Sequence, residues 1–115
     1  MTDRELLELA AKAAGYQFST SMRSLSRPPV PVILAESGRW KQWNPLHDDG
    51  DALRLAVKLN IHISLYGPDT GITAWIVKDS ANHFDADYGD DPCASTRRSI
   101  VRAAAEIGKS MGGGE

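Results

Sequence analysis

The chain has a single cysteine among 115 residues, which excludes any disulfide within it. Because unpaired cysteines are typical of proteins in reducing compartments, we expect a cytoplasmic protein in which Cys93 stays reduced. No apolar run approaches the roughly 20 residues that span a bilayer. The start of the chain, from Met1 to Glu5, does not resemble a secretory signal. We therefore expect no membrane partner.

An excess of charge of one sign is also missing. The chain carries 13 basic and 15 acidic residues, a formal net charge of −2. A protein whose main partner is nucleic acid usually has a net basic surface, so nucleic acid is not the expected partner. The apolar fraction of 42% is ordinary for a globular domain. We expect one domain over residues 1–111, followed by a disordered glycine-rich tail at 112–115.

Motifs for catalysis, metals and phosphate loops are lacking as well. The three histidines, His47, His62 and His83, show no metal-ligand spacing. The acidic clusters at residues 48–51 and 85–91 lack the spacing of a calcium loop, and helix capping is the better interpretation. Cys93 falls in the first turn of a predicted helix, where a reactive thiol is one hypothesis, but an inert thiol is the simpler expectation. We predict no metal site, no cofactor and no enzymatic activity.

What the sequence does contain is a set of clear helix boundaries. Thr2 and Glu5 have the spacing of a capping box at the start of the first predicted helix. At the start of the third predicted helix, Pro92 follows the acidic cap Asp91. Each helix shows a 3.6-residue apolar period. The predicted boundaries are Thr2 and Gly15 for the first helix, the acidic segment 48–51 and Asn60 for the second, and Asp91 and the glycines 112–114 for the third.

Alternating apolar residues predict strands between these helices. The clearest are Ile61–Tyr66 and Ile72–Lys78, joined by a turn, with an edge strand at His83–Tyr88. A shorter strand is expected at Val32–Ala35, and the proline-rich stretch Ser19–Pro31 is predicted to be a loop. The predicted fold class is α+β, with three helices packed on a small, mainly antiparallel sheet in a layered α/β sandwich.

Two groups of side chains suggest a ligand site. Trp40 and Trp43, with Lys41 between them, could stack on a base or a peptide. Arginines of the last helix, Arg97, Arg98 and Arg102, could grip a phosphate or a carboxylate. The alternatives are that the tryptophans cover the end of the core and that the arginines form a solvated or ion-paired face.

Three blocks of the sequence resemble the phage ABA sandwich domain family of small tailed-bacteriophage proteins. The blocks are Thr2–Gly15, Trp43–Leu46 with Asp48–Ala56, and Thr96–Gly108. The resemblance implies a phage-encoded α/β fold expressed in a bacterial host, with no established activity and therefore no catalytic residues to carry over.

On these grounds we expect a non-enzymatic accessory protein of the host cytoplasm. It would counter host defence by binding and sequestering a small anionic ligand, such as a nucleotide second messenger, through Trp40, Trp43, Arg97, Arg98 and Arg102. The alternative is an interaction module that binds and inhibits a host protein through an exposed aromatic patch. A hydrolase using histidine and aspartate is the weakest hypothesis, and assembly into a homo-oligomer stays open.

Overall fold

A computed structural model describes residues 2–21, 30–34, 37–67, 71–76, 79–86 and 91–111. Within these ranges the elements follow the order α1, β1, β2, β3, α2, β4, β5, β6, α3. The helices are α1 (Asp3–Ala14), α2 (Asp49–Leu59) and α3 (Pro92–Met111). The predicted α+β class, with helices packed on antiparallel sheet, is confirmed. The predicted tail at 112–115 lies outside the described residues.

The first helix begins and ends at the predicted residues. The Thr2 side chain accepts a hydrogen bond of 3.1 Å from the backbone N–H of Glu5, which satisfies one of the free donors of the first turn. Gly15 ends α1 in the left-handed conformation, with φ of 78°, and its N–H bonds back to the last turn.

The other two helices also follow their caps. The Asp48 carboxylate accepts a 2.8 Å hydrogen bond from the N–H of Asp51, and Asn60 ends α2 with φ of 54°. The Asp91 carboxylate accepts a 3.0 Å hydrogen bond from the N–H of Ala94 and so starts α3. The caps predicted at Thr2 and Asp91 are therefore confirmed, and within the predicted acidic segment 48–51 the cap is Asp48.

In the described part of the chain the strands form two antiparallel sheets of three strands each, a division that the sequence did not reveal. The first contains β1 (Phe18–Ser21), β2 (Val30–Leu34) and β3 (Trp40–Gln42), in that order. The predicted strand at 32–35 lies within β2 as far as Leu34. Of the predicted loop 19–31, residues 22–29 lie outside the described part of the chain.

The structure corrects the loop prediction at both ends: residues 19–21 belong to β1, and Pro31 belongs to the central strand β2 and pairs with Thr20. Proline is rare in a central strand since it has no N–H to donate. Here β3 ends at Gln42, and only the Pro31 carbonyl is used on that side, where it accepts a 3.0 Å hydrogen bond from the N–H of Trp43. The missing donor therefore falls next to the last residue pair of β3, and the one bond made there uses only the Pro31 carbonyl.

The second sheet joins the predicted hairpin and edge strand into a three-stranded meander, with β5 in the centre. It contains β4 (Ile61–Gly67), β5 (Gly71–Ile76) and β6 (Asp79–Ala86). The sequence predicts an edge strand at 83–88, but β6 starts earlier, at Asp79, which pairs with Ile76 of β5. Residues 87–90 lie outside the described ranges.

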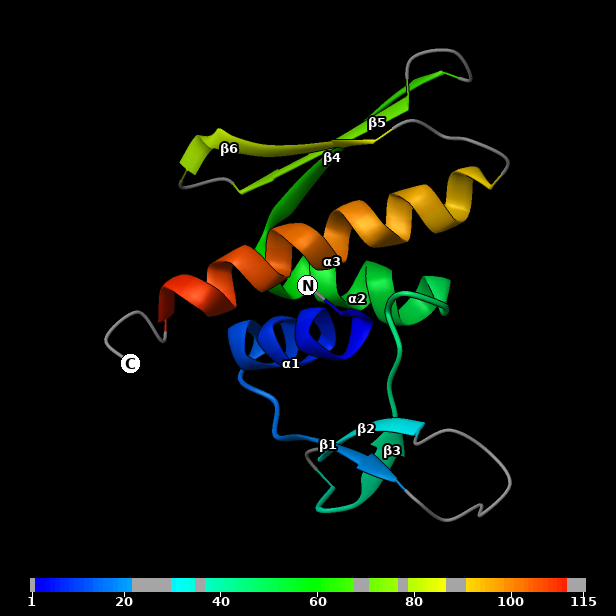
Figure 1. Cartoon of the computed structure of the whole chain (residues 1–115), viewed down its shortest axis with the longest axis vertical. Helices are drawn as coiled ribbons and strands as arrows, with labels where there is room; N and C mark the ends of the chain where they lie inside the picture. Colours follow the sequence, from blue (N-terminus) through cyan, green and yellow to red (C-terminus); the bar gives the residue numbers. More distant parts are fainter. Residues whose placement is uncertain are drawn as a thin grey trace.

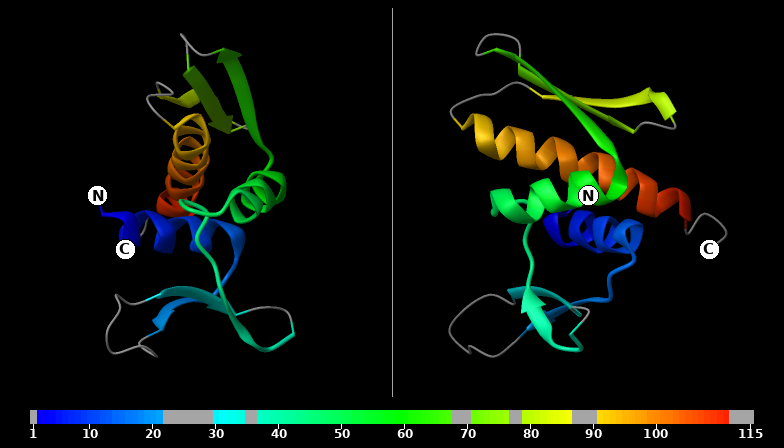
Figure 2. Two further views of the ribbon diagram at one scale, coloured as in Figure 1. Left: turned by 90° about the vertical axis from the view of Figure 1, so that its right-hand side faces the viewer. Right: turned by 180° about the vertical axis from the view of Figure 1, so that it is seen from behind.

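Helix α3 lies at the centre of the layers. Figures 1 and 2 show the β4–β5–β6 sheet on one side of α3 and helices α1 and α2 on the other, with the β1–β2–β3 sheet beyond α1. Small residues let α1 and α3 approach closely: Ala10, Ala11 and Ala104 have no exposed surface. The same core extends to Ile33 and Trp43, which tie the first sheet to the helices.

Candidate functional site

Trp43 lies in the core and cannot stack on a ligand from solution, which corrects its assignment as a site residue. Its side chain is only 3% exposed. The ring packs edge-on against Tyr16 and Phe18, with centroid distances of 5.8 and 6.3 Å. Trp40, three residues earlier and the first residue of the edge strand β3, is 48% exposed. The two indoles thus have different environments, and only Trp40 stays a candidate for ligand contact.

Arg97 is bonded to residues before and at the start of α2, so its guanidinium is not available for a ligand. Its Nε donates to the carbonyl of Leu46 at 2.9 Å, and its Nη1 lies 2.6 Å from the Asp49 carboxylate. The Arg97 side chain is only 15% exposed. These bonds join α3 to the start of α2, so the ion-paired alternative holds for this residue.

The same corner is ordered by side-chain acceptors. The Asp51 carboxylate accepts from the N–H of Asn44 at 3.0 Å and from Arg54 at 2.7 Å. The hydrogen bond to Asp51 raises the pKa of the exposed Arg54 guanidinium. The segment around Pro45 is therefore a structural connection.

Arg98 is also ion-paired, through Nη2 to Asp3 of α1 at 3.0 Å. Both side chains of this pair are about half exposed, so water weakens the attraction. Arg97 faces α2 and Arg98 faces α1, which means that the two groups do not grip one anion between them. Arg102 is exposed on α3, and its role in binding stays a prediction.

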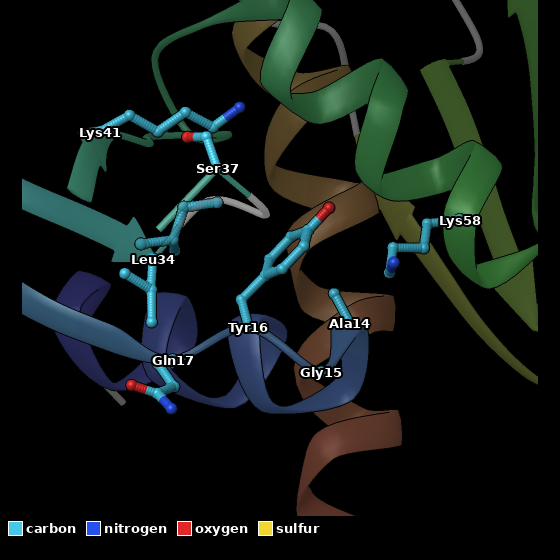
Figure 3. A pocket seen from close by; sticks show the side chains of 9 residues that line it. Ala14, Gly15, Tyr16, Gln17, Leu34, Ser37, Lys41 and Lys58 are labelled. Carbon is cyan, nitrogen blue, oxygen red and sulfur yellow. The ribbon is translucent and has the colours of Figure 1, made fainter. Parts of the chain in front are cut away.

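A more suitable site lies where the end of α1, the end of α2 and the β2–β3 turn meet (Figure 3). It is a pocket of about 540 Å³, within the usual range for small-molecule sites. The described residues that line it are Ala14, Gly15, Tyr16, Gln17, Ile33, Leu34, Ser37, Lys41 and Lys58. No carboxylate is among these described lining residues.

Two lysines give this pocket its charge. Figure 3 shows the Tyr16 ring rising between Lys41 on one side and Lys58 on the other, with Ser37 beside Lys41. The Lys58 ammonium lies 5.2 Å from the centroid of the Tyr16 ring, a cation–π distance. Within the described part of the chain neither lysine forms a salt bridge. Both ammonium groups therefore remain available to an anion.

Local structure explains how these groups come together. The left-handed turn at Gly15 ends α1 and directs Tyr16 out of the helix, with the Tyr16 N–H bonded to Ala11 at 2.9 Å. Lys58 lies in the last turn of α2. Lys41 is the middle residue of β3 and lies between the two tryptophans in the sequence. Tyr16 and Lys58 were missed as site residues because no local pattern links the ends of two helices.

A second cavity, of about 380 Å³, is largely apolar. It lies between α2, α3 and β4, where the exposed Cys93 and Pro92 face Leu53 and Ile63. Among the described residues no group of three or more potential metal ligands occurs, and no helix is long and apolar enough to cross a membrane.

Comparison of the chain with models of known families, with curated proteins and with solved structures gave no match. The resemblance to the phage ABA sandwich domain family therefore stays a prediction, and so does the setting in a bacterial host.

Proposed function

We propose that this protein binds and sequesters a small anionic ligand in the pocket formed by Tyr16, Lys41 and Lys58. The observation that supports the proposal is the pair of salt-bridge-free lysines around an aromatic ring, with no carboxylate among the described lining residues. The proposal keeps the ligand class expected from the sequence and moves the site from the tryptophans and arginines to this pocket.

The chemistry of the pocket suits a ligand with a phosphate and a flat ring. The two ammonium groups would neutralise the phosphate by charge-assisted hydrogen bonds. The Tyr16 ring would contact a base. The hydroxyl groups of Tyr16 and Ser37 and the side-chain amide of Gln17 would offer hydrogen bonds to the ligand. A nucleotide second messenger combines these features. In a phage accessory protein of the host cytoplasm, removing such a signal would counter host defence.

Calorimetric titration with cyclic di- and trinucleotides tests the proposal. We expect binding with a defined stoichiometry and a roughly tenfold loss of affinity in Lys41→Ala and in Lys58→Ala, since each removes one charge-assisted contact. Lys109→Ala is the matched control because Lys109 is an exposed lysine near the end of α3, outside the pocket. Affinity should fall with added salt. Absence of heat across the panel at high protein concentration would overturn the proposal, as would equal losses in all three variants.

Recovery of the ligand separates binding from hydrolysis. We expect mass spectrometry to return the bound nucleotide unchanged after long incubation, because sequestration makes and breaks no covalent bond. A changed mass would support the hydrolase hypothesis instead.

The exposed Trp40 favours a second candidate function, capture of a host protein. An indole that is 48% exposed on an edge strand is a typical interface anchor. A pull-down from host lysate should then recover one stoichiometric protein, and Trp40→Ala should lose it while leaving nucleotide binding intact. A ligand-sequestering protein recovers no such partner.

A further inference from the structure

Strand β4 is an edge of the second sheet and lacks the features that usually protect an edge. It runs over seven residues, Ile61–Gly67, and contains no lysine, carboxylate or proline. The opposite edge, β6, carries Asp79 and Asp85. Unprotected edge strands pair with other strands through their free backbone N–H and carbonyl groups, and proteins normally block them with charge.

An exposed apolar face of α2 lies beside this edge. Leu53 and Val57, one turn apart, are 61% and 70% exposed. With Ala56, Asn60 and the first residues of β4 they form a shallow groove of about 300 Å³. Leu53 and Ile63 also line the neighbouring apolar cavity, so the apolar surface continues towards α3. Large apolar side chains this exposed next to an open strand mark an interaction surface.

We propose that two copies of this chain associate through this surface, with β4 of one copy pairing antiparallel to β4 of the other about a twofold axis. Each copy would contribute three strands to one continuous sheet. Leu53 and Val57 of the two copies would cover one another beside the paired strands. An antiparallel pair of identical strands is self-complementary, as a twofold interface requires.

The charges around the surface favour a second copy as the occupant. Of the fixed charges on α2, Arg54 is bound to Asp51 at 2.7 Å, and Asp49 is bound to Arg97 at 2.6 Å. Lys58 faces Tyr16 on the ligand-pocket side of the helix. The described residues that line this groove include no lysine, arginine or carboxylate, so two identical grooves can meet without like-charge repulsion between such groups, whereas a charged partner would gain no ion pair there.

This inference does not depend on the proposed function, since the dimer surface and the ligand pocket share no residue. Sedimentation equilibrium of the full chain tests it. We expect the mass to rise with concentration from 12.5 kDa to twice that value. Val57→Glu should abolish this rise, because the new carboxylates of two copies would meet in the interface.

Met111→Glu is the matched control. Met111 is an equally accessible apolar residue, 59% exposed, at the far end of α3, and its substitution should leave the dimer intact. Circular dichroism should show all three proteins folded, since both substituted side chains lie at the surface. A monomeric mass at every concentration would overturn the proposal, and so would a dimer that Val57→Glu leaves unchanged.

Amide hydrogen exchange locates the contact independently of any substitution. We expect exchange within residues 61–67 to slow at least tenfold between dilute and concentrated protein. Slowing in other strands but not in β4 would contradict the pairing. Slowing only after addition of an extended peptide would assign the edge to a different partner and overturn the dimer.

Discussion

Gly108 of α3 packs directly against the backbone carbonyl of Leu9 in α1. A Cβ atom at position 108 would overlap the Leu9 oxygen and lie 2.8 Å from its carbonyl carbon. The obstacle is backbone, which cannot rotate away as a side chain can. The absence of a side chain at this one position therefore sets how closely the two helices approach.

The contact predicts a penalty for Gly108→Ala. Overlap with a fixed backbone should lower the free energy of unfolding by about 1–3 kcal/mol, even though alanine favours a helix. Gly50→Ala in α2 is the control, because there the added Cβ would meet only the ends of the Arg54 and Asp48 side chains. Urea denaturation should show a loss for the first variant and little change or a gain for the second. Similar midpoints for both would contradict the close approach.

The two arginine pairs should differ in their contribution to stability. Arg97→Ala removes a part-buried hydrogen bond to Leu46 and the ion pair with Asp49, and we expect a loss of about 1.5–3 kcal/mol. Arg98→Ala removes an exposed pair with Asp3 and should cost less than about 1 kcal/mol. Thermal unfolding of both variants measures the difference. If Arg98→Ala cost as much as Arg97→Ala, the structural role assigned to Arg97 would be wrong.

The tryptophans provide another contrasting pair. Trp43→Ala should cost about 3–5 kcal/mol, because it empties a site enclosed by Tyr16 and Phe18. Trp40→Ala should change stability by less than about 1 kcal/mol, since nearly half of that side chain is already in water. Trp43→Phe retains part of the packing and should fall between them. Equal effects at positions 40 and 43 would contradict their different burial.

Asn60 tests the left-handed end of α2. Its φ of 54° is unfavourable for residues with a Cβ atom, and asparagine tolerates it better than most. We expect Asn60→Ala to destabilise the protein by about 1 kcal/mol and Asn60→Gly to be neutral or stabilising. The denaturant midpoint of Asn60→Ala should lie below that of the parent protein, and the midpoint of Asn60→Gly should equal or exceed that of the parent. The reverse order would exclude a left-handed residue 60.

The sequence predicted what is determined locally. Thr2, Gly15 and Asn60 act on backbone groups within a few residues of themselves, so their roles were visible in the pattern. Pro31 was assigned to a loop because its partner, the N–H of Trp43, is supplied by tertiary structure.

The site was harder to predict for the same reason. Lys58 and Tyr16 come from the ends of different helices, and only the fold brings the ammonium over the ring. The burial of Trp43 depends on Tyr16 and Phe18 in the same way. Residue type alone could not separate this core tryptophan from the exposed Trp40.

The central position of α3 also bears on how the chain is made. A ribosome delivers α3 after every other described element, yet α3 is the helix against which α1, α2 and the second sheet pack. A nascent chain stalled before residue 92 therefore lacks the helix that fills the middle of this core. Packing of the described elements should be completed only after α3 has been synthesised.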